Sequence, residues 1–155
     1  MNLNTDQSFK YSGQVCIKAI SNNICYKTIN VKNSGTNYLF KIFRDALTGN
    51  QKNKDRVSTL RLYSSGSTTS ALTEVTFENF TLSDSDADNS VTFKFYVPFY
   101  KIPASTDINK LALFSEGTIQ SRQELASITL SDSNKITANG NTDFIIYWKL
   151  SVDNQ

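Results

Sequence analysis

The sequence predicts a mainly β protein, an antiparallel β-sandwich of jelly-roll or immunoglobulin-like type with one amphipathic helix. Short segments of alternating apolar and polar residues recur along the chain, and clusters of Gly, Ser, Asn and Asp separate them. Asn, Ser and Thr number 16, 19 and 16, a composition that suits many turns and polar outer sheet faces. Ten Phe and seven Tyr supply the apolar surface for a core.

One domain accounts for the whole length of 155 residues, with 1–9 as an N-terminal arm and 36–49 as a helix. The net charge of +2 gives no electrostatic reason to expect nucleic acid or an anionic membrane as a partner. The first residues have no basic start and no apolar run, and no segment is apolar for long enough to span a membrane. We therefore expect a protein that is made in a cytoplasm.

The clearest of eight expected strands spans residues 143–152, where every second side chain is apolar. Trp148 lies in the middle of this pattern and is expected at the centre of the core. The strand at 90–100 alternates in the same way, and its inner face is expected to carry Val91, Phe93, Phe95, Val97 and Phe99. Pro98 has no N–H to donate to a neighbouring strand, which predicts a sheet edge or a bulge there.

Six weaker strands complete the pattern, at residues 8–20, 24–32, 57–64, 73–82, 108–115 and 124–130. In the fourth of these the apolar parity changes between Phe77 and Phe80. An extra residue in one strand shifts the parity of everything that follows it, so we expect a β-bulge near Asn79.

The two cysteines, Cys16 and Cys25, flank the expected hairpin turn at 21–23. With a three-residue turn, Ala19 faces Cys25 and Cys16 faces Thr28. The two sulfur atoms then lie on opposite faces of the sheet and three residue pairs apart, too far for a disulfide bond. We therefore expect two reduced cysteines that serve as packing residues.

One amphipathic helix is expected from Thr36 to Gly49. Thr36 or Ser34 is expected to cap its start, and Gly49 suits the left-handed position after its end. Tyr38 and Phe40 flank the apolar stripe, so that apolar side chains cover more than half of the helix surface. We expect the helix to cover one open end of the sandwich, or in addition to contact a neighbouring subunit. The stripe consists of Leu39, Ile42, Phe43, Ala46 and Leu47.

No catalytic machinery is recognisable in the sequence. Histidine is absent, which removes the usual general base and the commonest metal ligand. Two scattered cysteines do not make a structural zinc site, and no glycine-rich phosphate loop follows a strand. The stretch 84–89 begins like a calcium loop, but Asn89 and Phe95 stand where an EF-hand needs Gly and Glu. We expect no enzyme, no cofactor and no metal; a looser calcium turn at 84–89 is the alternative to a solvated acidic turn.

The segments follow one another in a particular order. A β-hairpin precedes an amphipathic helix that ends in Leu-x-Gly at 47–49, and a strand at 60–66 ends in glycine. Two later segments read Ile-x-x-Leu-x-Leu-Phe at 108–114 and, at 145–152, a strand similar to Ile-x-Trp-x-Ile-x-Val. In this order the chain, over roughly residues 24–152, resembles small virion proteins of tailed bacteriophages. The resemblance implies a structural role in capsid decoration, a head fibre or the tail, and it carries over no site residue because the pattern defines a fold.

The sequence therefore favours a non-enzymatic structural protein of a bacteriophage virion, made in the host cytoplasm. It is expected to assemble on the capsid or its fibres through contacts with its own copies and with other virion proteins. The alternatives are a tail or baseplate component, or a lectin-like module that binds a carbohydrate or a receptor and stacks Tyr96, Tyr100 and Tyr147 on sugar rings. The expected interface residues are Tyr38, Phe40, Tyr96, Tyr100, Leu3 and Phe9.

Overall fold

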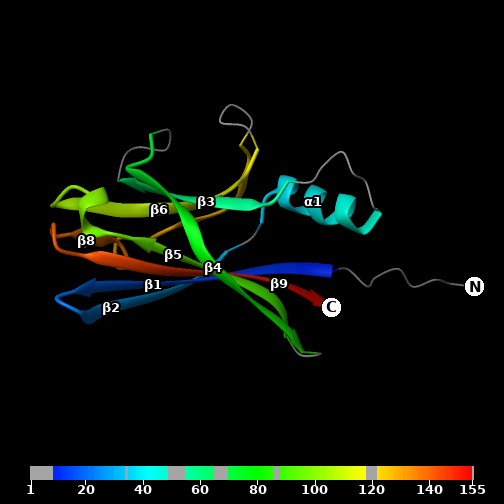
Figure 1. Cartoon of the computed structure of the whole chain (residues 1–155), viewed down its shortest axis with the longest axis horizontal. Helices are drawn as coiled ribbons and strands as arrows, with labels where there is room; N and C mark the ends of the chain where they lie inside the picture. Colours follow the sequence, from blue (N-terminus) through cyan, green and yellow to red (C-terminus); the bar gives the residue numbers. More distant parts are fainter. Residues whose placement is uncertain are drawn as a thin grey trace, which may run out of the picture.

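The computed structural model of the chain describes residues 9–33, 35–48, 55–64, 70–85, 88–117 and 122–154. Nine strands, one α-helix and one short 3-10 helix follow one another along it, as Figure 1 shows. In chain order these elements are β1 (Phe9–Ser21), β2 (Ile24–Asn33), α1 (Asn37–Thr48), β3 (Val57–Ser64), β4 (Thr73–Ser85), β5 (Asp88–Val97), η1 (Phe99–Lys101), β6 (Thr106–Ser115), β7 (Glu124–Thr129), β8 (Ile136–Ala138) and β9 (Asp143–Asn154).

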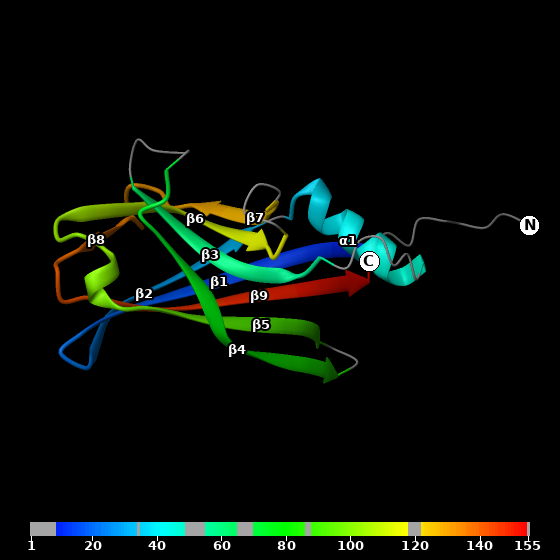
Figure 2. The same ribbon diagram turned by 45° about the horizontal axis from the view of Figure 1, so that its top comes forward.

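The strands form one antiparallel sheet that curls into a half-barrel (Figures 1 and 2). Its order is β2-β1-β9-β5-β4-β3-β6-β7, and β8 pairs with β6 beside this path. The nine strands hold most of the described residues, which confirms the mainly β prediction. The predicted β-sandwich is not confirmed, because β4 is hydrogen-bonded to β5 in one layer and to β3 in the other. The two layers are halves of one sheet.

The passage from one layer to the other takes place within β4. Residues Thr73–Thr76 pair with β3, and the residues from Phe77 onward pair with β5. Phe77 and Asn79 face consecutive residues of β5, which leaves Glu78 as an extra residue. The β-bulge predicted near Asn79 is therefore confirmed. Because of it, Phe77 and Phe80 both point to the inner face although they are three residues apart.

The inner face of the half-barrel holds the core. Trp148 of β9 is 0% exposed and lies in register between Val15 of β1 and Phe93 of β5, so its predicted place in the core is confirmed. Leucines of β3 and β6, from the opposite layer, belong to the same core cluster as Trp148. The largest fully buried side chains include Trp148, Phe95, Phe144, Ile17, Leu60, Leu62, Ile108, Leu111 and Leu113.

The β1–β2 hairpin differs from the prediction. Its turn consists of Asn22 and Asn23 alone, with φ of 52° and 63°, a left-handed conformation that Asn tolerates. A bulge in β2 then places Cys25 opposite Ile20, on the same outer face as Cys16. The predicted opposite faces are therefore wrong. Both thiols are nevertheless free. Cys25 lies opposite Ile20, and Ile20 is four residues, about 13 Å, along β1 from Cys16, which is too far for a disulfide bond. Cys25 is exposed, and its Sγ lies 3.5 Å from Thr28 Oγ1 on the outer face.

The predicted helix is confirmed as α1. Thr36 caps its start, where Thr36 Oγ1 accepts a hydrogen bond from Leu39 N at 3.4 Å. Thr36 also joins the helix to β7, because its N–H donates to Leu125 O (2.9 Å) and its hydroxyl donates to Glu124 O (2.8 Å). Gly49 lies outside the described residues. Within the described part of the chain, no helix has the length and apolar character that crossing a membrane requires.

The end of β5 corrects a second prediction. The strand stops at Val97, and Pro98 leads into η1. Since β5 lies between β9 and β4, Pro98 marks a strand end and not a sheet edge. Phe99, which was expected on the inner face, is the first residue of η1 and is 47% exposed.

Candidate functional site

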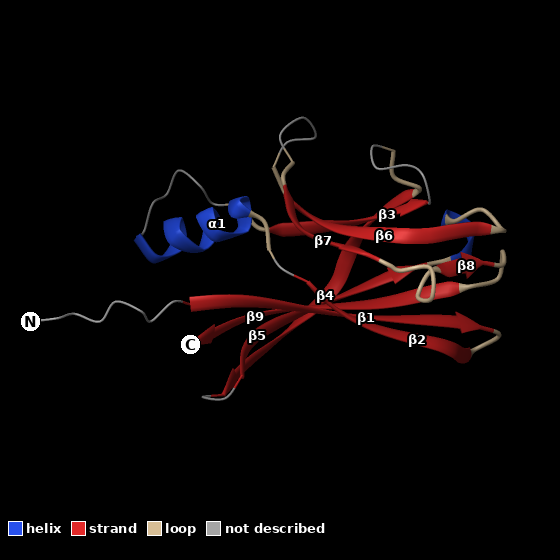
Figure 3. Cartoon of the chain, turned by 180° about the vertical axis from the view of Figure 1, so that it is seen from behind, coloured by secondary structure: helices blue, strands red, loops and turns tan. Residues whose placement is uncertain are grey.

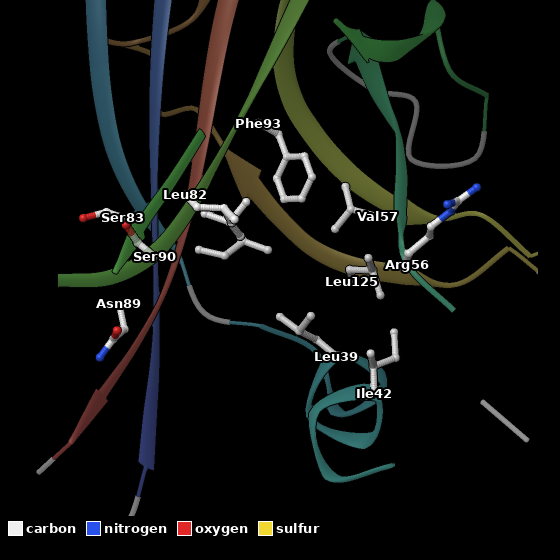
Figure 4. Close-up of a pocket in the computed structure, with 12 residues that line it drawn as sticks. Leu39, Ile42, Arg56, Val57, Leu82, Ser83, Asn89, Ser90, Phe93 and Leu125 are labelled. Carbon is white, nitrogen blue, oxygen red and sulfur yellow. The ribbon is translucent and has the colours of Figure 1, made fainter. Parts of the chain in front are cut away.

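An apolar pocket of about 410 Å³ opens at the end of the half-barrel that carries α1. Figure 4 shows Leu39 and Ile42 pointing from α1 toward Leu125 and Phe93 across this space. We call this the open end of the molecule. The residues that line the pocket are Leu39, Ile42, Val57, Leu82, Val91, Phe93, Leu125 and Leu150, with the polar Arg56, Ser83, Asn89 and Ser90.

The pocket exists because β3 and β4 separate after the bulge. From Phe77 onward the described residues of β4 pair with β5 and with no strand on the other side. Phe80 and Leu82 face the buried side of β5, yet they are 54% and 69% exposed. The ring of Phe80 lies 6.1 Å from that of Phe93, so the core continues outward into an uncovered apolar surface. Phe80 and Leu82 on β4 and Phe40 on α1 are exposed, and we call these three side chains together the open-end patch.

Figure 3 shows η1 and the β1–β2 turn at the end of the molecule opposite α1, and exposed apolar side chains lie on both. Thr142 and Asp143, where β9 begins, connect the β1–β2 hairpin and η1 to this end of the sheet. Tyr26 Oη and Thr142 Oγ1 are hydrogen-bonded at 3.0 Å, and Asp143 Oδ1 accepts a hydrogen bond from Phe99 N at 2.8 Å. Burial and the Asp143 carboxylate raise the pKa of Tyr96. We call the exposed members the hairpin-end patch: Ile24, Tyr26, Tyr96, Phe99 and Tyr100.

The outer face of the layer that contains β2, β1, β9 and β5 is polar. The strand register sets its side chains in rows across the sheet: Lys32–Gln14–Lys149–Thr92, Asn30–Cys16–Tyr147–Lys94 and Thr28–Lys18–Ile145–Tyr96, the last of which ends in the hairpin-end patch. The members of the first two rows other than Lys94 line a hollow of about 310 Å³, together with Val15 and Val31. The ammonium of Lys18 lies 5.6 Å from the centre of the Tyr147 ring. We call these three rows the polar sheet face.

The outer face of the other layer carries paired charges. Glu74 of β4 binds Arg61 of β3 and Arg122, while Lys110 and Lys135 pair with carboxylates on neighbouring strands. Burial raises the pKa of Glu74, but the hydrogen bonds from the two guanidinium groups outweigh it and leave the pKa below its ordinary value. These charges neutralise one another within the layer.

Asp55 holds α1 against the end of the sheet. Its Oδ2 accepts a hydrogen bond from Tyr38 Oη at 2.8 Å, and its Oδ1 accepts from Gly117 N at 3.2 Å and Arg56 N at 3.0 Å. Burial raises the pKa of Asp55, but these hydrogen bonds and one from Ser115 together outweigh burial. The pKa of Asp55 is therefore below its ordinary value. Tyr38 is therefore a half-buried anchor of the helix.

The expected interface residues fall at both ends of the molecule. Tyr96 and Tyr100 lie together in the hairpin-end patch, 38% and 73% exposed, while Phe40 lies on α1 at the open end. Phe9 begins β1 opposite Asn154, and Leu3 lies outside the described residues. Five further exposed apolar residues were not predicted as interface residues from the sequence: Phe80, Leu82, Phe99, Ile24 and Tyr26. For the first two a signal existed, because the predicted bulge turns them to the inner face of a strand that extends past its neighbour.

The described residues contain no group of three or more Cys, Asp or Glu side chains that could hold a metal ion. The comparisons with known proteins give no relative: no protein-family model, no curated protein and no solved structure matches this chain. The functional interpretation therefore depends on the surfaces described above.

Proposed function

We propose that the chain is a non-enzymatic structural protein of a bacteriophage virion, which assembles on the capsid or its fibres through protein–protein contacts. The observation that carries the proposal is the gathering of exposed apolar side chains at the two opposite ends of the molecule. Exposed contiguous apolar patches are rare on soluble monomers and mark interaction sites. The order of the sequence segments, which resembles that of small phage virion proteins, supports the virion as the place of assembly.

The two end patches differ in composition and shape, which favours contact between unlike ends. The open-end patch is an aliphatic and phenylalanine surface beside a pocket, and the hairpin-end patch is a mainly aromatic group of side chains around η1 and the β1–β2 turn. A contact between two different surfaces of the same chain is head-to-tail, and it closes into a ring or continues as a fibre. We therefore propose that η1 of one copy packs into the open end of the next and buries about 800 Å² on each partner, as specific interfaces do.

Analytical ultracentrifugation over a micromolar range tests this contact with two double variants. One carries Phe80→Ser and Leu82→Ser at the open end, and the other carries Phe99→Ser and Tyr100→Ser at the hairpin end. Wild type is expected to form species larger than a dimer as its concentration rises, while each variant alone stays monomeric. An equimolar mixture of the two variants is expected to form a dimer and nothing larger, because one intact end of each kind remains.

The results that oppose the proposal are distinct. Wild type that stays monomeric at every concentration rules out self-assembly. Variants that each still dimerise alone show a symmetric contact at one end, which contradicts the head-to-tail arrangement. The location is tested separately, by probing purified particles of the phage that encodes the chain with an antibody under the electron microscope. Particles without the protein contradict the virion assignment. A matched control, Thr76→Ala on the exposed surface of β4, is expected to assemble as wild type does.

A further inference from the structure

The edges of β2 and β4 have no neighbouring strand among the described residues. β2 ends the strand order and pairs with β1 alone, and β4 pairs with β5 alone from Phe77 onward. The edge of β7 is different, because a bridge from Gly35 to Ala126 occupies it. Every second residue of an edge strand directs its N–H and C=O groups away from the sheet, where a further strand can bind them.

Both edges carry exposed apolar side chains that lie two residues apart. On β2 these are Ile24 and Tyr26, which belong to the hairpin-end patch, and on β4 they are Phe80 and Leu82 of the open-end patch. All the residues 78–82 of β4 are exposed, although they form part of a strand. The β1–β2 turn and the end of β4 lie at opposite ends of the molecule (Figures 1 and 2), so these two edges are not able to pair within one copy.

The two edges also differ in the sign of their charged residues. The charged residues of β2 are Lys27 and Lys32, and those of β4 from the bulge onward are Glu78 and Asp84. Glu78 also contacts the neighbouring strand, where its Oε2 lies 3.5 Å from Lys94 Nζ. Two copies of the same edge would place like charges beside one another, which destabilises strand pairing. Lysines and a bulge on an edge strand oppose pairing with another copy of that strand, whereas an acidic edge attracts the lysines.

We propose that the edge of β2 in one copy pairs with the free edge of β4 in the next, so that the sheet continues from copy to copy. The inference rests on the head-to-tail assembly proposed above, and it adds backbone hydrogen bonds to the side-chain contacts of that assembly. In this arrangement Ile24 and Tyr26 of one copy lie beside Phe80 and Leu82 of the next as cross-strand neighbours.

Cross-linking through Cys25 tests the pairing, because this cysteine already lies on the β2 edge and points to the outer face. On β4 the outward residues are Asn79, Thr81 and Ser83, which alternate with Phe80 and Leu82. The variants Asn79→Cys, Thr81→Cys and Ser83→Cys, each in a Cys16→Ser chain, cover the registers in which a thiol of β4 faces Cys25 of the next copy. Oxidation with copper–phenanthroline is expected to link more than two copies in at least one variant, as seen on a non-reducing gel.

The matched control is Thr76→Cys, an exposed position on the part of β4 that pairs with β3, and it is expected to give no linked chains. Replacing Cys25 by serine is expected to abolish the links in every variant. Dimers that still form in the Cys25→Ser chains would show β4 paired with β4, which overturns the choice of β2 as the partner.

Amide hydrogen exchange of the wild-type chain, followed by mass spectrometry, compares the assembled protein with the dilute monomer. Exchange is expected to slow about tenfold or more over residues 24–30 and 78–85, since their N–H groups become hydrogen-bonded, and to stay unchanged in the interior strand β9. Assembly without slower exchange at 78–85 and without links to Cys25 overturns the strand pairing and leaves the head-to-tail contact in place. Wild type that stays monomeric at every concentration overturns both.

Discussion

Replacing Trp148 by alanine tests the strand register of the layer that contains β2, β1, β9 and β5. The indole is 0% exposed and has Val15 on one neighbouring strand and Phe93 on the other. Removal of a buried Trp or Phe side chain costs about 3–5 kcal/mol, because apolar contacts are lost and a cavity remains. A domain of this size is stable by roughly 5–15 kcal/mol, so Trp148→Ala is expected to lose a large part of its free energy of unfolding.

Urea denaturation followed by far-ultraviolet circular dichroism measures the effect, since the variant has no tryptophan fluorescence. Tyr147→Ala is the matched control: the neighbouring side chain points to the polar sheet face and is half-buried, so it is expected to cost about 1 kcal/mol. Trp148→Phe, expected to cost less than Trp148→Ala, keeps the test open if the alanine variant does not fold. A Trp148→Ala variant that loses no more stability than Tyr147→Ala would refute the register.

Two other predictions concern the thiols and one carboxylate. Because Cys16 and Cys25 are free and distant, reductant is expected to leave the thermal midpoint of wild type unchanged, as in the Cys16→Ser, Cys25→Ser variant; a fall in wild type alone would reveal a bridge. Glu74 has a pKa below its ordinary value of 4.5, so its stabilising effect is present above about pH 4.5 and is lost as the pH falls through its folded pKa. Glu74→Gln is accordingly expected to be less stable than wild type at pH 7 and nearly equal to it at pH 3 in urea denaturation; a difference independent of pH would contradict the role of the Arg61 and Arg122 pairs.

The strands were predictable from the sequence because their side chains alternate. The parity of β9 placed Trp148 in the core, and the break in parity along β4 predicted a bulge near Asn79, next to the extra residue Glu78. β8, only three residues long, gives too short a pattern to detect. The bulge beside Cys25 was also missed. A three-residue turn and a two-residue Asn-Asn turn followed by a bulge give nearly the same pattern of residues, so the sequence does not distinguish them.

The surfaces were less predictable than the strands, because they depend on which strands become neighbours. Four lysines spread from position 18 to 149 come to lie on the polar sheet face only when β2, β1, β9 and β5 lie side by side in register. Tyr96 and Tyr100 were identified as interface candidates by their exposure pattern, but their partner Phe99 was assigned to the core, since Pro98 was read as part of the strand. Composition and alternation determine which way a side chain points, and they do not determine what stands next to it.

The bulge at Glu78 connects the fold to the proposed contacts. Without an extra residue β4 would continue with one parity, and Phe80 and Leu82 would point outward among the polar residues of the layer. With it, both point inward, past the place where β3 has already separated from β4. The core therefore extends beyond the layer that would cover it, and α1 closes only part of the opening. We propose that a second copy covers this exposed apolar surface, and the mainly aromatic side chains around η1 are the candidate partner surface.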